Sequence, residues 1–129
     1  MKFTNKAVIK AFEDLHLEWL MDRAEDIADS DIIGQSDAEI AWDTVDYHLF
    51  WYKEKDTDEW CELMSARKLL KETDDGKRIP IIPWTWEIKE GYRPSDIKHA
   101  REVIAEYESM KKLEKKLYRI VQKEQRRKA

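Results

Sequence analysis

The sequence predicts an all-α protein of about four helices in a small bundle, with a long C-terminal helix. Only three glycines and three prolines interrupt its 129 residues, which favours long helices over many short strands. Apolar residues recur at steps of three and four, the spacing of a buried helix face. Hydrophobic residues make up 42% of the chain, too many for a disordered protein.

The first half of the chain predicts two helices. The first is expected from about residue 5 to residue 28, with Thr4 as its N-cap. Gly34 marks the turn that follows, and Ser36 and Glu39 then form a capping-box pattern at the start of a second helix over about 37–54.

The second half predicts two more helices and an irregular segment between them. Thr57 is placed to cap the third helix, which ends before Gly76. Residues 78–93, rich in proline and tryptophan, are expected to cross the bundle as an extended, irregular segment. Pro94, Ser95 and Asp96 restart the chain as the last helix, with Pro94 or Ser95 near its first turn, and this helix can run to about Lys123 because nothing interrupts it.

Length and cysteine content suggest one domain in a reducing compartment. A chain of 129 residues is usually a single domain. Cys61 is the only cysteine, so an internal disulfide or a cysteine-based metal site is impossible. The apolar runs are too short for a signal peptide or a membrane span. We therefore expect a single helical domain, residues 1–129, located in the cytoplasm and not in a membrane.

Charge is distributed unevenly along the chain, whose net charge is −4. Residues 1–60 carry 6 basic and 16 acidic side chains, a balance of −10, whereas residues 109–129 carry 9 basic and 2 acidic ones, a balance of +7. We interpret 109–129 as a basic helical extension that is able to project. It could contact an acidic partner or nucleic acid, or join copies of the chain head to tail. A solvated helix end explains the charges equally well. The predicted basic surface comprises Lys111, Lys112, Lys115, Lys116, Arg119, Lys123, Arg126 and Arg127.

Six tryptophans are unusual for this length. The helix over 37–54 has apolar residues on two sides, which is typical of a central core helix or of a helix that offers one side to a partner. Aromatic side chains are enriched at protein interfaces. The predicted partner-binding residues are Trp42, Tyr47, Trp51, Trp84 and Trp86.

These observations favour a non-enzymatic interaction protein that binds a protein partner, expected to be helical, through a tryptophan-rich face. A chaperone, adaptor or inhibitor role, such as that of a phage accessory protein or morphogenesis chaperone, suits a small, highly charged chain. A second hypothesis is non-specific binding of nucleic acid by the basic C-terminal helix.

A third hypothesis is enzymatic. Asp22 and Glu25 lie one turn apart near the end of the first predicted helix, and Asp43 and Asp46 do so near the start of the second. This arrangement resembles the all-α nucleoside triphosphate pyrophosphohydrolases, which use E-x-x-E and E-x-x-D on consecutive helices. The resemblance covers about residues 18–50, and it implies that these four carboxylates bind Mg²⁺. It departs from the family pattern where Asp22 and Asp43 replace glutamates. Outside this alternative, no metal or other cofactor is expected.

Overall fold

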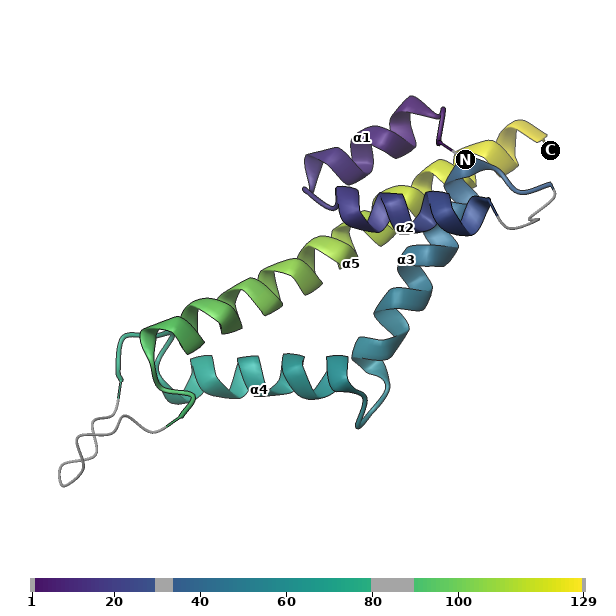
Figure 1. Cartoon of the computed structure of the whole chain (residues 1–129). Helices are drawn as coiled ribbons and strands as arrows, with labels where there is room; N and C mark the ends of the chain where they lie inside the picture. Colours follow the sequence, from purple (N-terminus) through teal and green to yellow (C-terminus); the bar gives the residue numbers. More distant parts are fainter. Residues whose placement is uncertain (1, 30–33, 80–89, 129) are drawn as a thin grey trace, which may run out of the picture. The chain divides into compact units, whose positions relative to one another are not determined.

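The computed structural model describes residues 2–29, 34–79 and 90–128, which form five α-helices and no strand. Figure 1 shows them in chain order. The helices are α1 (Lys6–Asp14), α2 (Glu18–Ala28), α3 (Asp37–Lys53), α4 (Asp58–Glu72) and α5 (Pro94–Lys128). The predicted all-α fold class and the long C-terminal helix are confirmed. By their internal contacts the residues form two compact units: unit 1 (Met1–Phe50 with Glu108–Ala129) and unit 2 (Trp51–Tyr107).

The first predicted helix is in fact two helices, so the prediction of one continuous helix over 5–28 is wrong. The break lies at His16, whose φ of 56° is in the left-handed region. The amide of Leu17 donates to the carbonyl oxygen of Phe12 at 3.0 Å, and the amide of His16 donates to that of Glu13 at 3.0 Å. These two bonds form the Schellman motif that ends many helices.

The N-cap of α1 is Asn5, and the prediction of Thr4 at this position is wrong. The side-chain Oδ1 of Asn5 accepts hydrogen bonds from the amides of Ala7 and Val8. The amides of Thr4 and Asn5 instead donate to Oδ2 of Asp37, at 2.8 and 2.9 Å. The start of α1 is therefore fixed both by its own cap and by a carboxylate from the start of α3.

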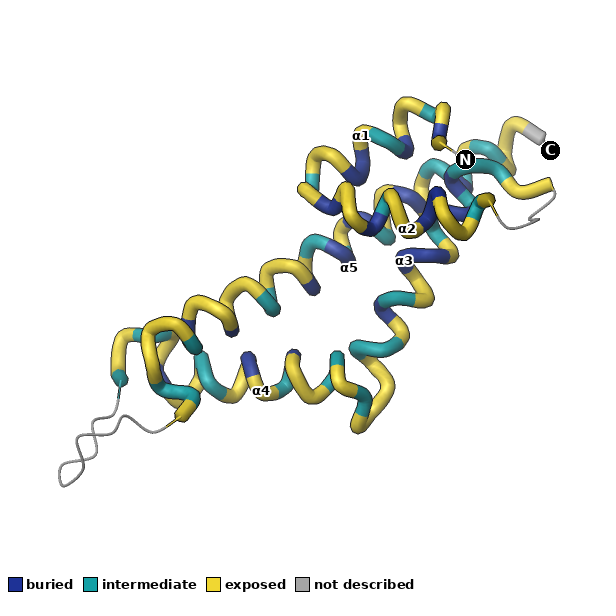
Figure 2. Tube along the Cα trace, in the orientation of Figure 1, coloured by how far each residue is buried: buried dark blue, intermediate teal, exposed yellow. Residues whose placement is uncertain are grey.

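Unit 1 is built from α1, α2, most of α3 and the C-terminal part of α5. Each of these helices contains buried residues, coloured dark blue in Figure 2, and most of them are apolar. The amide of Phe3 also donates to the buried Oε2 of Glu25 at 2.7 Å, which ties the N-terminal segment to α2. The core side chains are Val8, Phe12, Leu20, Ala24, Ile40, Ala41, Val45, Leu49, Met110, Leu113, Leu117 and Val121.

Unit 2 contains the end of α3, all of α4 and the N-terminal part of α5. Thr57 caps α4 as predicted, because its Oγ1 accepts a hydrogen bond from the amide of Trp60 at 3.1 Å. The rings of Tyr52 and Tyr107 lie 5.2 Å apart between centroids, and the guanidinium of Arg67 lies 5.5 Å from the centre of the Tyr107 ring. The buried residues of this unit include Leu63, Ala66, Thr73, Ile97 and Ala100.

The irregular segment predicted over 78–93 is described only at its ends. Arg78 and Ile79 are not helical, and neither are residues 90–93. Residues 80–89, which include Trp84 and Trp86, lie outside the described residues. The last helix begins at Pro94, in agreement with the prediction of Pro94 or Ser95 near its first turn, and continues past Lys123 to Lys128. Within the described ranges, no helix is both long enough and apolar enough to cross a membrane.

Candidate interaction surfaces

The exposed side of α3 carries Tyr47, the most exposed of the described residues that were predicted to bind a partner. The buried residues around Tyr47 on this helix, which include Thr44, Val45 and Leu49, face the core of unit 1. Tyr47 lies away from that core, with 62% of its surface exposed. Phe50, one turn further along, is 47% exposed. Because residues three apart on a helix are neighbours, Tyr47 and Phe50 share one outward face.

Acidic residues flank these two rings. At about 100° per residue, Asp43 falls between Phe50 and Tyr47 around the helix axis, and Asp46 falls beside Phe50. Burial, followed by the neighbouring Asp46 carboxylate, raises the pKa of Asp43, while a hydrogen bond from Gln35 lowers it by a smaller amount. We call Asp43, Asp46, Tyr47 and Phe50 the acidic-aromatic face.

Phe50 was not among the residues predicted from the sequence, although its spacing from Tyr47 was a usable signal. Trp19 and Tyr118, which are both exposed, were not among them either. The ring of Trp19 on α2 meets the ring of His48 edge-on, with 5.4 Å between centroids. Among the described residues, all large apolar side chains that are exposed belong to unit 1.

Trp42 and Trp51, also predicted to bind a partner, are both half-buried. The Trp42 ring lies 5.7 Å from the Tyr118 ring between centroids, at an interplanar angle of 40°. Its indole Nε1 is buried and has no hydrogen-bond partner in the described part of the chain. The carbonyl oxygen of Trp51 accepts a hydrogen bond from the Thr57 hydroxyl. Trp42 therefore contributes to packing against Tyr118, and the backbone of Trp51 contributes to the turn before α4, whereas Tyr47 is mostly exposed.

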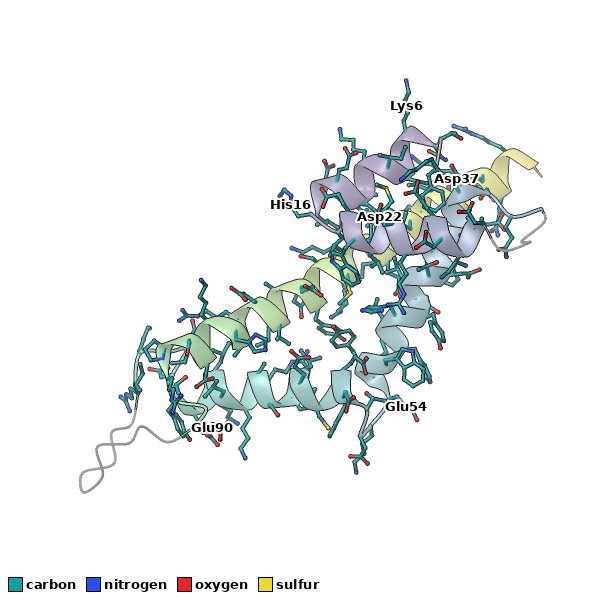
Figure 3. All side chains as sticks on the ribbon, viewed as in Figure 1. Lys6, His16, Asp22, Asp37, Glu54 and Glu90 are labelled. Atoms are coloured by element: carbon teal, nitrogen blue, oxygen red, sulfur yellow. The ribbon has the colours of Figure 1, made fainter. Side chains whose placement is uncertain are left out.

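The four carboxylates of the enzymatic hypothesis have different surroundings. Asp22 and Glu25 line a shallow hollow together with Lys2, Asp26 and Asp29, and neither Asp43 nor Asp46 lines it. Figure 3 labels Asp22 on α2 and Asp37 at the start of α3. Glu25 is buried and bonds to the amide of Phe3, with the Lys2 ammonium 3.7 Å from its Oε1. Among the described residues, no group of three or more acidic, histidine or cysteine side chains could hold a metal ion.

The C-terminal part of α5 in unit 1 has one buried face and one basic face. Met110, Leu113, Leu117 and Val121 are buried. Lys111 is half-buried and forms an ion pair with Glu108 at 3.9 Å. The other predicted basic residues are exposed: Lys112, Lys115, Lys116, Arg119, Lys123, Arg126 and Arg127. We call these seven residues the basic stripe.

Unit 2 contains a separate small hollow between α4 and α5. Its lining includes Tyr52, Glu62, His99 and Glu106. Nε2 of His99 lies 3.2 Å from Oε1 of Glu62. Burial and then the carboxylates of Glu106, Glu62 and Glu59 raise the pKa of Tyr52 to about 12. A phenol that stays protonated to such high pH is a poor base or nucleophile, so Tyr52 is not a candidate for either role.

The site residues therefore form three separate sets: the acidic-aromatic face of α3, the basic stripe of α5, and the hollow of unit 2. The first two contain most of the residues singled out from the sequence. Comparison of the chain with protein-family models, with curated proteins and with solved structures gives no match.

Proposed function

We propose that this chain is a non-enzymatic protein-interaction protein that binds a protein partner through the acidic-aromatic face of α3. The observation that carries this proposal is the exposure of two large rings, Tyr47 and Phe50, on adjacent turns of one helix. Single exposed apolar residues are ordinary, but adjacent exposed aromatics are a feature of binding surfaces. Burying such rings contributes much of the binding free energy at protein interfaces.

The surroundings of the two rings indicate what kind of partner would fit. A helix presents a ridge of side chains, and two rings one turn apart match apolar side chains on a partner helix. Asp43 and Asp46 add negative charge at the edge of the rings. We therefore expect a helical partner segment with apolar side chains on one face and lysine or arginine beside them. An adaptor, chaperone or inhibitor would use such a surface.

The other aromatic residues predicted to bind a partner are compatible with this proposal, but the proposal does not depend on them. Trp42 and Trp51 are half-buried and would contribute at the edge of a partner's footprint. Trp84 and Trp86 lie outside the described residues, and their part in binding stays a prediction from the sequence. Cys61 is an exposed free thiol, which suits the reducing cytoplasm that we keep as part of the proposal.

A pull-down from native lysate with matched variants tests the proposal. The bait is the full chain, either unchanged or carrying Tyr47→Ser and Phe50→Ser together. The control is Tyr118→Ser, because Tyr118 is as exposed as Phe50, at 47%, but belongs to α5. Half of each lysate is treated with nuclease, so that capture through nucleic acid is separated from direct capture.

We expect one or more proteins to bind the unchanged chain and the Tyr118 variant, with and without nuclease, and to be lost from the double variant. Circular dichroism should show that all three chains stay folded, because each substituted side chain is at least 47% exposed. Equal recovery by the double variant, or no protein recovered by the unchanged chain, would contradict the proposal.

A further inference from the structure

The basic stripe of α5 contains only one kind of charge. At about 100° per residue, its seven members fall in one sector of the helix, about 120° wide. That sector lies opposite the buried side chains of Met110 and Leu117. Between positions 110 and 127, no acidic, apolar or neutral residue falls within it. Lysine and arginine therefore occupy every position of this sector between residues 110 and 127.

The acidic residues of this part of the helix do not neutralise the stripe. Glu114 and Glu124 are the two acidic residues after position 109, and both lie toward the buried side, where they are half-buried. Oε2 of Glu124 accepts a hydrogen bond from the Ser36 hydroxyl at 2.6 Å. In the described part of the chain, none of the seven basic side chains takes part in a salt bridge.

The geometry of the stripe matches a regular array of negative charges. From Lys112 to Arg127 the helix rises about 22 Å at 1.5 Å per residue. Duplex DNA carries one phosphate charge per about 1.7 Å of its axis, so several cations of the stripe can meet phosphates at once. We propose that the basic stripe binds the phosphate backbone of double-stranded nucleic acid without reading its sequence.

Other occupants fit the stripe less well. A protein interface has an apolar or aromatic centre and is depleted in lysine, and the stripe has no such residue. A helix lying on a membrane inserts its apolar face, whereas the apolar face of this helix is buried in unit 1. Phosphate contact needs only the cations that are present.

The overall charge of −4 does not prevent such binding, but the salt concentration must be controlled when the affinity is measured. Charges on other parts of the surface are screened over about 10 Å at 0.1 M salt. Each phosphate that the stripe neutralises releases counterions, so affinity falls as salt rises. The proposal stands independently of the partner of α3, because the two surfaces share no residue.

Fluorescence anisotropy with a labelled mixed-sequence DNA duplex, measured over a salt series, tests the proposal. The stripe variant carries Lys112→Gln, Lys116→Gln and Lys123→Gln. The control carries Lys6→Gln, Lys10→Gln and Lys98→Gln, which removes the same charge from exposed helical positions outside the stripe. Glutamine keeps a helix propensity close to that of lysine, and circular dichroism checks that both variants stay folded.

We expect the unchanged chain and the control to bind the duplex with Kd values that rise steeply with salt. The stripe variant should bind at least about tenfold more weakly at 0.1 M salt, and its salt slope should be shallower by about 0.9 for each phosphate that it no longer neutralises. An equal loss of affinity in the stripe variant and the control would overturn the proposal. Absence of DNA binding at low salt would also overturn it. If sedimentation then shows self-association that the stripe substitutions abolish, the stripe binds a second copy of the chain.

Discussion

The hydroxyl of Ser36 donates a hydrogen bond of 2.6 Å to Oε2 of Glu124, across 88 positions of the sequence. The same hydroxyl oxygen accepts a hydrogen bond from the amide of Glu39 at 3.2 Å, so Ser36 caps α3 while it contacts α5. A cap that also makes a tertiary contact fixes where the helix begins relative to the rest of unit 1. The end of α5 that carries the basic stripe is held by the same bond.

Because Ser36 has this double role, substitutions of Ser36 and Glu124 should lower the free energy of unfolding by different amounts. Ser36→Ala removes both hydrogen bonds and should lower the free energy of unfolding by about 1–2 kcal/mol. Glu124→Ala removes only the tertiary bond and should cost about 1 kcal/mol or less. Urea unfolding measures both, with Ser65→Ala on the exposed side of α4 as the control. A Ser36→Ala cost no larger than that of Ser65→Ala would contradict the double role.

Two glycines with nearly the same backbone conformation have very different surroundings. Gly76 has a φ of 85° and Gly34 a φ of 87°. A Cβ on Gly76 would lie 2.8 Å from Nη2 of Arg101 and 2.8 Å from Cγ2 of Ile97, whereas a Cβ on Gly34 meets no atom of the described residues within 4 Å. Alanine at either position is strained by about 1–2 kcal/mol.

We therefore expect Gly76→Ala to be the more destabilising change, by about a further 1–3 kcal/mol. Both variants carry the same backbone strain, so the difference between their free energies of unfolding measures the crowding against the start of α5 alone. Urea unfolding of both proteins measures it. If the two alanine variants are equally stable, Arg101 and Ile97 move aside without cost.

The signals that predicted the fold correctly were local ones. Ser36, Thr57 and Pro94 mark helix starts by chemistry that acts within one turn, and the structure places α3, α4 and α5 where those residues predict. The basic stripe was also predictable, because its members alternate with the apolar residues of one helix at fixed spacing. Such features need no knowledge of what lies elsewhere in the chain.

The features that the sequence did not predict depend on distant contacts. Thr4 was the expected cap of α1, but its amide donates to Asp37, and that contact joins segments 33 positions apart. Trp42 and Tyr47 looked alike as interface residues, yet the Tyr118 ring lies against Trp42 while Tyr47 stays mostly exposed. Helical periodicity shows which residues are apolar, but it does not show which neighbour covers them.

The break at His16 shows the same limit. Phe12 in α1 and Leu20 in α2 are both buried, so the apolar periodicity continues across the break. His16→Gly should raise the free energy of unfolding by about 0.5–1 kcal/mol, because glycine adopts a positive φ without the strain of a side chain. Glu13→Gly, in the last turn of α1, should instead lower it by about 1 kcal/mol. Two changes of the same sign in thermal or urea unfolding would contradict the assigned helix break.

Tyr52 couples the stability of the fold to alkaline pH, because its pKa is raised to about 12 chiefly by burial and then by the carboxylates of Glu106, Glu62 and Glu59. An unfolded chain has a tyrosine pKa of about 10, so folding favours the protonated phenol. The resulting stability is fully present below about pH 10 and is lost as the pH rises from about 10 to about 12, because the unfolded state releases its proton first.

Tyrosinate absorbance after a rapid pH jump measures the native protein before it unfolds. We expect one of the five tyrosines to ionise near pH 12, and we expect Tyr52→Phe to remove that step whereas Tyr118→Phe keeps it. Glu106→Gln should lower the pH of the step, since it removes the largest of the carboxylate contributions. If the step survives Tyr52→Phe, another tyrosine is responsible, and the decline in stability above pH 10 would then not depend on the hollow of unit 2.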